Sequence, residues 1–235
     1  MENVKKIGIV PAAKLDAVEN IWDNIYRIVT TYPTRIYENG GIPIGLLPNI
    51  DQYSEELLDM VDAILICGGT QSFDYQFQSI DHAVKHGKPL LGICLGMQMI
   101  NTYFTVKAEA EKRGFEGDLL ELYKQMKHEG RSFLKRVEDH VKFPVPLGRE
   151  DECKHKVLVK NGSLLHKLTG SEEIYGATIH RYCVGEAAPD LEVIGRAEDG
   201  TIEAVQYGDK VLGIQFHAEA DRMLPGIFKF LTGQE

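Results

Sequence analysis

The sequence predicts an α/β fold: a doubly wound, mostly parallel sheet flanked by helices, with additional antiparallel β-hairpins and a helical insertion. Three observations support this fold class. Short, continuous apolar runs alternate with helix-like patterns over residues 7–93. A charge-dense stretch follows at 107–149. From residue 154 onwards, β-type segments are separated by the hairpin-type pairs Asp199-Gly200 and Gly208-Asp209.

The first part of the chain predicts the parallel strands. Apolar runs predict strands at 7–11, 42–47, 63–67 and 89–93, and helical spacing predicts helices at 15–28, 51–60 and 78–86. We expect Tyr32-Pro33 to close the first of these helices. Strands that are apolar throughout are typical of parallel sheets, because helices cover both faces. Functional groups in such sheets gather at the carboxyl ends of the strands.

The stretch at 107–149 predicts one or two amphipathic helices, which form a helical insertion at 107–150. An apolar stripe with helical spacing supports this, and it consists of Leu119, Leu120, Leu122, Tyr123 and Met126. Two interpretations remain open, namely a solvated insertion and a lid or partner-docking arm. The stripe could also form a homodimer contact.

The last part of the chain predicts shorter strands and a terminal helix. The strands are expected at 156–159, 182–184, 192–195, 202–205 and 211–214, and the helix at 224–231. We find no internal repeat and no flexible linker. The sequence therefore predicts a single domain over residues 1–235.

Composition excludes several classes of protein. The 235 residues carry a formal net charge of −9, which disfavours binding to nucleic acid or to an anionic membrane. There is no run of eighteen apolar residues, and the N-terminal residues lack an apolar signal core. The four cysteines form no C-x-x-C pair, so neither a zinc knuckle nor a redox dithiol is indicated. We expect a cytoplasmic protein with reduced thiols.

Cys94 is the most informative residue. It lies in the pattern G-x-C-x-G, between an apolar run and a helix-like segment. This is the cysteine form of the strand–nucleophile–helix bend, which exposes a nucleophile above an α/β sheet. A thiol at a helix N-terminus meets unpaired N–H groups that stabilise a thiolate and a developing oxyanion. The alternative is a buried strand cysteine beside packing glycines.

A cysteine nucleophile needs a base and a group that orients the base. His217 follows the last predicted strand, and Glu219 lies two residues on, where an extended backbone would place both side chains on one face. His82, His86, His128 and His140 are expected at the surface. Cys67, Cys153 and Cys183 are expected to be structural.

Gly92–Gln98 together with Gly213–Glu219 resembles the class I glutamine amidotransferases. This resemblance implies a flavodoxin-like fold and a Cys94–His217–Glu219 triad that acts on a γ-glutamyl carbonyl. Asp199–Ala204 resembles the corresponding hairpin of the γ-glutamyl hydrolases, and of the γ-glutamyl-γ-aminobutyrate hydrolase group in particular.

Three departures from these patterns stand out. Ala218 replaces the proline that usually lies between the histidine and the glutamate, and Leu95 replaces the arginine common in the hydrolases. Asn101–Phe104 stands where the hydrolases carry a Gly-Gly pair, which leaves the substrate open.

The mechanism that the resemblance implies assigns further roles. The backbone N–H groups of Leu95 and Gly69 would form the oxyanion hole. Gln98, His180 and Arg181 would bind the glutamyl group. No metal and no cofactor is expected, because the thiolate supplies the nucleophile and backbone dipoles supply the electrophilic aid.

Three functions remain open. The first is hydrolysis of a small γ-glutamyl amide through a thioester, which releases an amine. The second is a glutaminase subunit that delivers ammonia to a separate synthetase partner. The third is a non-catalytic binding protein of the same fold.

Overall fold

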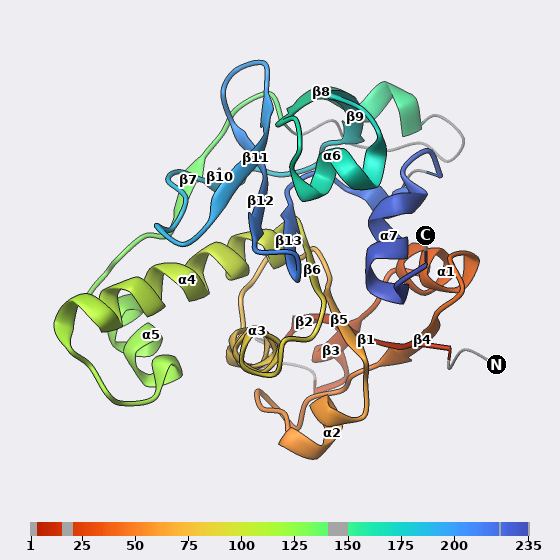
Figure 1. Cartoon of the computed structure of the whole chain (residues 1–235). Helices are drawn as coiled ribbons and strands as arrows, with labels where there is room; N and C mark the ends of the chain where they lie inside the picture. The colour runs from red at the N-terminus through yellow and green to blue at the C-terminus, as the bar shows by residue number, and fades with distance from the viewer. Residues whose placement is uncertain (1–3, 16–20, 141–149, 221, 235) are drawn as a thin grey trace.

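A nine-stranded sheet, in the order β4-β1-β5-β6-β13-β12-β11-β8-β9, forms the centre of the computed structural model, which describes residues 4–15, 21–140, 150–220 and 222–234 (Figure 1). The parallel strands are β4 (Ile42–Gly45), β1 (Lys6–Val10), β5 (Ala63–Ile66), β6 (Leu90–Ile93) and β13 (Val211–Ile214). The antiparallel strands are β12 (Ile202–Tyr207), β11 (Glu192–Ala197), β8 (Lys154–Val159) and β9 (Glu173–Ala177). The predicted fold class is confirmed.

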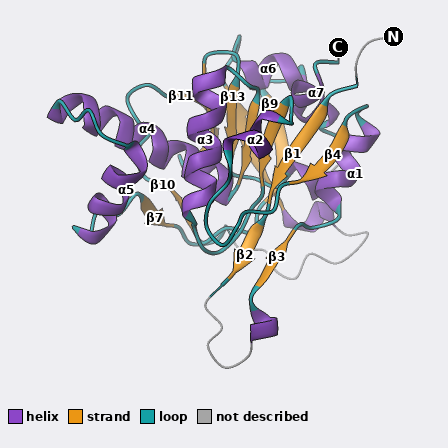
Figure 2. Cartoon of the chain, turned by 90° about the horizontal axis from the view of Figure 1, so that it is seen from below, coloured by secondary structure: helices purple, strands orange, loops and turns teal. Residues whose placement is uncertain are grey.

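Helices cover both faces of the sheet (Figures 1 and 2). One face carries α2 (Glu55–Asp59), α3 (Asp74–His86), α4 (Leu95–Arg113) and α5 (Leu119–His128), and the other carries α1 (Thr31–Glu38), α6 (Leu164–Thr169) and α7 (Pro225–Thr232). Successive residues of β5 alternate between the two cores. Ile64 and Ile66 belong to the core on the α3–α5 face, and Leu65 belongs to the core on the α7 face.

Smaller elements surround the sheet. β2 (Ala12–Lys14) pairs with β3 (Ile25–Arg27), and β7 (Leu134–Arg136) pairs with β10 (Tyr182–Val184). Three 3-10 helices are η1 (Ile21–Asp23), η2 (Glu150–Cys153) and η3 (Ala218–Ala220). Both predicted hairpins are present, because β11 pairs with β12 and β12 pairs with β13, each antiparallel.

The helix predicted at 15–28 is wrong. β3 and η1 occupy much of that range, and residues 16–20 lie outside the described residues. Tyr32-Pro33 does not close a helix but lies in the first turn of α1. Proline is tolerated there, because the first N–H groups of a helix have no intrahelical acceptor.

Other boundaries also differ from the predictions. α2 is shorter than the helix predicted at 51–60, and α3 begins at Asp74 rather than at residue 78. The sequence patterns also failed to indicate α6 and β9. β9 is an edge strand that contains Gly176, and glycine weakens a strand signal.

The insertion is only partly a separate unit. α4 continues through Lys107–Arg113 and ends at Gly114, which has φ +60°. α5 then packs beside α4, and its stripe contributes Leu120, Leu122, Tyr123 and Met126 to the buried core. The stripe is therefore covered within the chain and does not offer the exposed dimer contact that the sequence suggested. Residues 141–149, near the end of the predicted insertion, lie outside the described residues.

Among the described residues, every helix is too short or too polar to traverse a lipid bilayer.

Candidate active site

The predicted bend around Cys94 is present. β6 ends at Ile93, and Cys94 caps the N-terminus of α4 with φ +54° and ψ −105°. A non-glycine residue with positive φ is uncommon and strained. The flanking glycines are required, because a Cβ on Gly92 would lie 2.5 Å from the carbonyl carbon of Gly96, and a Cβ on Gly96 would lie 2.5 Å from the Ile66 oxygen.

The sheet brings His217 next to Cys94 although 123 residues separate them. β13 pairs in parallel with β6, so that Ile214 lies opposite Ile93, and the Cys94 N–H donates to the Ile214 carbonyl at 2.8 Å. Both side chains converge on Gly68. A Cβ on that glycine would lie 2.9 Å from His217 Cε1 and 3.3 Å from Cys94 Cβ.

Glu219 contacts the histidine. His217 Nδ1 and Glu219 Oε1 lie 2.5 Å apart, and both residues are buried. The expected extended backbone is absent, because Glu219 lies in η3. The contact forms nevertheless. Burial lowers the pKa of His217, but the Glu219 carboxylate and the nearby Cys94 side chain outweigh burial and raise this pKa well above its usual value.

Helix α1 supports the site through two residues that the sequence analysis missed. The Tyr32 hydroxyl accepts a hydrogen bond from the Gly68 N–H at 3.0 Å. Burial and the neighbouring Glu219 charge raise the pKa of Tyr32. Arg35 Nε donates to the Glu219 carbonyl at 3.1 Å. The available signal was the i, i+3 spacing of these residues on one helix face.

The two peptide groups predicted to form an oxyanion hole lie beside Cys94. Leu95 is the first residue of α4, where backbone N–H groups have no intrahelical acceptor. Gly69 and Leu95 both line the cavity next to the thiol. The N–H of neighbouring Gly68 donates to the Tyr32 hydroxyl.

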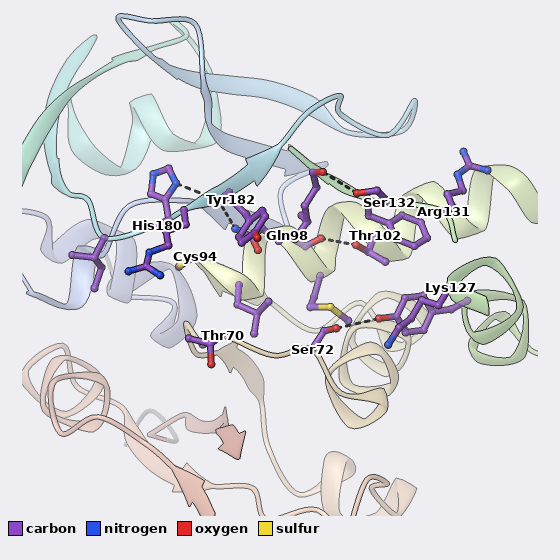
Figure 3. Close-up of a pocket in the computed structure, with 18 residues that line it drawn as sticks. Thr70, Ser72, Cys94, Gln98, Thr102, Lys127, Arg131, Ser132, His180 and Tyr182 are labelled. Atoms are coloured by element: carbon purple, nitrogen blue, oxygen red, sulfur yellow. Dashed lines mark hydrogen bonds between the residues drawn. The ribbon is translucent and has the colours of Figure 1, made fainter. Parts of the chain in front are cut away.

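A cavity of about 840 Å³ opens beside Cys94 and extends along α4 to α5 (Figure 3). Cys94, Gln98 and His180 border one end. Lys127 and Arg131 lie at the end remote from the thiol. The wall between them includes the apolar and aromatic side chains of Leu95, Met99, Tyr123, Phe133, Leu134 and Tyr182. The sequence analysis did not connect the insertion with this cavity.

The three predicted substrate-binding residues all line the cavity, but their surroundings differ. Gln98 Nε2 already donates to the Tyr182 carbonyl at 2.8 Å and to Gln215 Oε1 at 3.1 Å. His180 is 3% exposed, and its ring belongs mainly to a cluster of buried histidines. Arg181 is exposed at the cavity rim.

The remaining cysteines lie in the interior. Cys67, Cys153 and Cys183 are buried free thiols, which agrees with the structural role expected for them. Burial raises the pKa of Cys67 and of Cys183, and this keeps both groups protonated and unreactive.

A model of the family described as Peptidase C26 matches residues 72–219, which is more than half of the chain. The chain belongs to the Peptidase C26 family. This match spans the cysteine bend and the His217–Glu219 segment, and it begins just after the Gly68–Gly69 loop.

Relatives of this Peptidase C26 member are glutamine amidotransferase-like. A Rickettsia prowazekii protein described as glutamine amidotransferase-like is 25% identical over 239 residues, and the alignment covers 83% of each chain. A CTP synthase of Thermotoga maritima is 29% identical over 187 residues, which cover 72% of this chain and 34% of the relative. The chain thus spans about a third of that synthase.

A solved structure shows the same fold. The glutaminase domain of Trypanosoma brucei CTP synthase superposes with a TM-score of 0.68 at 15% identity, over 99% of this chain and 95% of that domain. The resemblance to the class I glutamine amidotransferase fold is confirmed. Together with the family match, it indicates a hydrolytic enzyme of the glutamine amidotransferase-like kind.

Proposed function

We propose that this protein hydrolyses a γ-glutamyl amide through a thioester on Cys94 and releases glutamate and an amine. The observation that carries this proposal is the cavity, which starts at Cys94 and continues along α4 to α5. Its volume of about 840 Å³ falls in the range of about 300–1,000 Å³ typical of pockets for drug-sized ligands. A glutaminase pocket has to hold glutamine only.

In the acylation step, the Cys94 thiolate attacks the γ-carbonyl carbon, and the thiol proton resides on His217. Glu219 holds the imidazole and stabilises its protonated form. The tetrahedral oxyanion receives hydrogen bonds from the Leu95 and Gly69 N–H groups. Loss of one such donor typically costs about 2.7–4 kcal/mol of transition-state stabilisation.

The intermediate then collapses. His217 gives its proton to the amide nitrogen, the C–N bond breaks, and the amine leaves with a thioester left on Cys94. His217 next takes a proton from water, whose oxygen attacks the thioester carbon. The second tetrahedral intermediate releases glutamate and returns the proton to the Cys94–His217 pair.

The cavity also favours a class of leaving amine. We assign the glutamyl group to the end that Gln98, His180 and Arg181 border. The amine then points along α4 past Met99 and Tyr123. Apolar and aromatic side chains favour an amine with an apolar body, and Lys127 and Arg131 at the remote end favour one that carries a carboxylate or another anion.

A second candidate is a glutaminase that delivers ammonia to a synthetase partner. The similarity to CTP synthases and to a CTP synthase glutaminase domain favours it. This function requires a separate acceptor protein. Because ammonia is small, the outer part of the cavity would then hold no part of the substrate.

The test compares amine release from three substrates by the purified protein alone: glutamine, γ-glutamyl methylamide and γ-glutamyl 4-aminobenzoate. We expect the aminobenzoate conjugate to have the highest kcat/KM. Cys94→Ala should abolish turnover, whereas the matched variant Cys153→Ala should keep it. A glutamine-analogue electrophile should label Cys94, as mass spectrometry would reveal.

Three outcomes would contradict the proposal. Turnover that survives in Cys94→Ala, or a label on another cysteine, would remove Cys94 as the nucleophile. Activity towards glutamine alone, and only after a synthetase is added, would establish the second candidate instead.

A further inference from the structure

Three histidines surround the buried carboxylate of Glu203. His140 Nδ1 lies 3.5 Å and His180 Nε2 lies 3.4 Å from Glu203 Oε1, and His155 Nε2 lies 3.3 Å from Oε2. The residues come from four segments: β8, β12, the turn before β10 and the chain after β7. The surface position predicted for His140 is wrong, because this residue is only 5% exposed.

Three buried polar atoms in this cluster have no hydrogen-bond partner among the described residues. Glu203 is 0% exposed, and neither of its carboxylate oxygens has a hydrogen-bond partner among the described residues. His155 Nε2 also has no hydrogen-bond partner within the described part of the chain. An unpaired buried polar group is costly, and an unpaired buried charge is more so. The buried Glu203 carboxylate therefore requires a compensating positive charge, from a bound cation or from protons on the histidines.

The outer contacts of two histidines define which ring nitrogens carry hydrogen. His140 Nε2 lies 2.9 Å from Asp199 Oδ2, and His180 Nδ1 lies 3.2 Å from the Tyr182 carbonyl. Both partners only accept hydrogen bonds, so these two nitrogens are the N–H donors. In neutral rings, the inner nitrogens then carry lone pairs, and they face each other at 3.1 Å beside the Glu203 carboxylate. A cation between them removes this repulsion.

We propose that His140, His155 and Glu203, with His180 as the fourth ligand, bind a Zn²⁺ ion. Donors bonded to Zn²⁺ at about 2.0–2.1 Å in a tetrahedron lie about 3.3–3.4 Å apart. Each histidine donor lies 3.3–3.5 Å from a Glu203 oxygen, and the His140 and His180 donors lie 3.1 Å apart. The donor atoms of His140, His155 and Glu203 all lie within 4.8 Å of one another, so that binding of the ion would draw them closer together. Imidazole nitrogen and carboxylate oxygen are common zinc ligands.

The hydrogen bonds on the outer side of His140 and His180 match a further property of metal sites. A metal-binding histidine usually donates its other N–H to a carboxylate or a backbone carbonyl. Asp199 fills this role for His140, and the Tyr182 carbonyl fills it for His180. Glu203 and Asp199 together also balance the charge of a divalent ion.

The site has a structural role in the fold. Four protein ligands leave no open position, which is typical of structural rather than catalytic zinc. The ion would tie His180, and with it the cavity wall at Arg181 and Tyr182, to β8 and β12. No step of the proposed hydrolysis passes through the ion, which would affect substrate binding only by fixing the position of the His180 wall. Zn²⁺ binding is measured without turnover, so its failure is distinguishable from failure of the proposed hydrolysis.

The test measures Zn²⁺ binding to protein freed of metal by a chelator, in a Cys94→Ala background so that the proposed active-site thiol cannot bind the ion. Calorimetry and metal analysis should show one equivalent, and Zn²⁺ should raise the Tm by at least about 2–4 °C. Co²⁺ should give the intense visible absorption of a tetrahedral site.

Substitutions of single residues in the cluster test where the ion binds. His155→Asn should weaken Zn²⁺ binding at least about tenfold, and Asp199→Asn should weaken it about 10–100-fold through the outer contact. Asp199 is half-exposed, so its variant should fold even where His155→Asn does not. The matched control is His86→Asn, in the separate Asp59, His82 and His86 cluster on α2 and α3, and it should leave the tight site intact.

Three results would overturn the proposal. The first is absence of stoichiometric Zn²⁺ in the Cys94→Ala protein. The second is loss of binding in His86→Asn but not in His155→Asn or Asp199→Asn. The third is a weak octahedral Co²⁺ spectrum. Each would mean that protons on the histidines, rather than a metal, neutralise Glu203.

Discussion

At the scale of single residues, the strained backbone of Cys94 and the burial of His217 and Glu219 favour the proposed chemistry. Cys94 holds a backbone conformation that costs about 1–3 kcal/mol for a non-glycine residue, and the surrounding contacts enforce it. His217 is buried against Glu219, so that the two form one hydrogen-bonded unit. Tyr32 and Arg35 fix the position of that unit from α1. The strained cysteine, the buried His217–Glu219 pair and the two α1 residues therefore all belong to the proposed active site.

Removal of the Glu219 charge tests this unit. The carboxylate raises the pKa of His217, so Glu219→Gln should lower that pKa and let the imidazolium lose its proton at lower pH. The basic limb of the kcat/KM profile for γ-glutamyl amide hydrolysis should therefore move to lower pH. We expect kcat/KM to fall about 10²–10⁴-fold.

The matched control for this experiment is Glu56→Gln, which alters an exposed glutamate on α2. Its profile should coincide with that of the unmodified protein. A Glu219→Gln enzyme whose basic limb stays in place would show that this carboxylate does not act on the histidine.

Among the elements, α5 is a helix whose role the sequence left open, and its contacts in the structure indicate that role. Its stripe is buried against the core on the α3–α5 face, and Tyr123 and Lys127 contribute to the cavity wall. The ring of Phe77 on α3 stacks on Tyr123 with centroids 4.9 Å apart. The sequence left open a solvated insertion and a lid or partner-docking arm. These contacts instead favour a third arrangement, in which α5 is a fixed wall of the cavity rather than a mobile lid.

Truncation of a core residue on α5 distinguishes these interpretations. Met126 is 0% exposed, so Met126→Ala should lower the free energy of unfolding by about 2–5 kcal/mol in chemical denaturation. Met60→Ala, at a residue that is 64% exposed, should change it by less than about 0.5 kcal/mol. Global stability that is equal in both variants would instead indicate a lid that opens independently.

At the scale of the whole molecule, one sheet joins two cores. The core on the α3–α5 face includes Ile100, and the core on the α7 face includes Ile36. The central strands contribute side chains to both cores, so neither face can lose its packing without disturbing the other. The single domain over residues 1–235 stays a prediction, and it requires the two cores to unfold together.

Paired substitutions test that prediction. Ile100→Val and Ile36→Val should each destabilise the protein by about 0.5–1.5 kcal/mol. Because the residues lie on opposite faces, the double variant should equal their sum within about 0.5 kcal/mol. All three variants should unfold in a single transition by circular dichroism and by Trp22 fluorescence. Separate transitions for the two probes would indicate two domains.

Local sequence patterns were sufficient to predict those elements whose side chains are compatible with only one kind of structural environment. The apolar runs became the central strands, the Gly-Asp and Asp-Gly pairs became hairpins, and the glycines around Cys94 marked the bend. The helix predicted at 15–28 failed because apolar spacing alone does not distinguish a short irregular segment from a helix. β9 was missed because an edge strand with a glycine carries a weak pattern.

By itself, the sequence determined the fold class and singled out Cys94, His217 and Glu219. The reason is that backbone sterics and the alternation of buried and exposed positions depend on residues that are neighbours in the sequence. Only the tertiary structure decided which distant groups meet. The pairing of β6 with β13 brings Cys94 to His217, α1 supplies Tyr32 and Arg35, and four separate segments enclose Glu203. Such contacts depend on how the elements pack, and no local pattern records them.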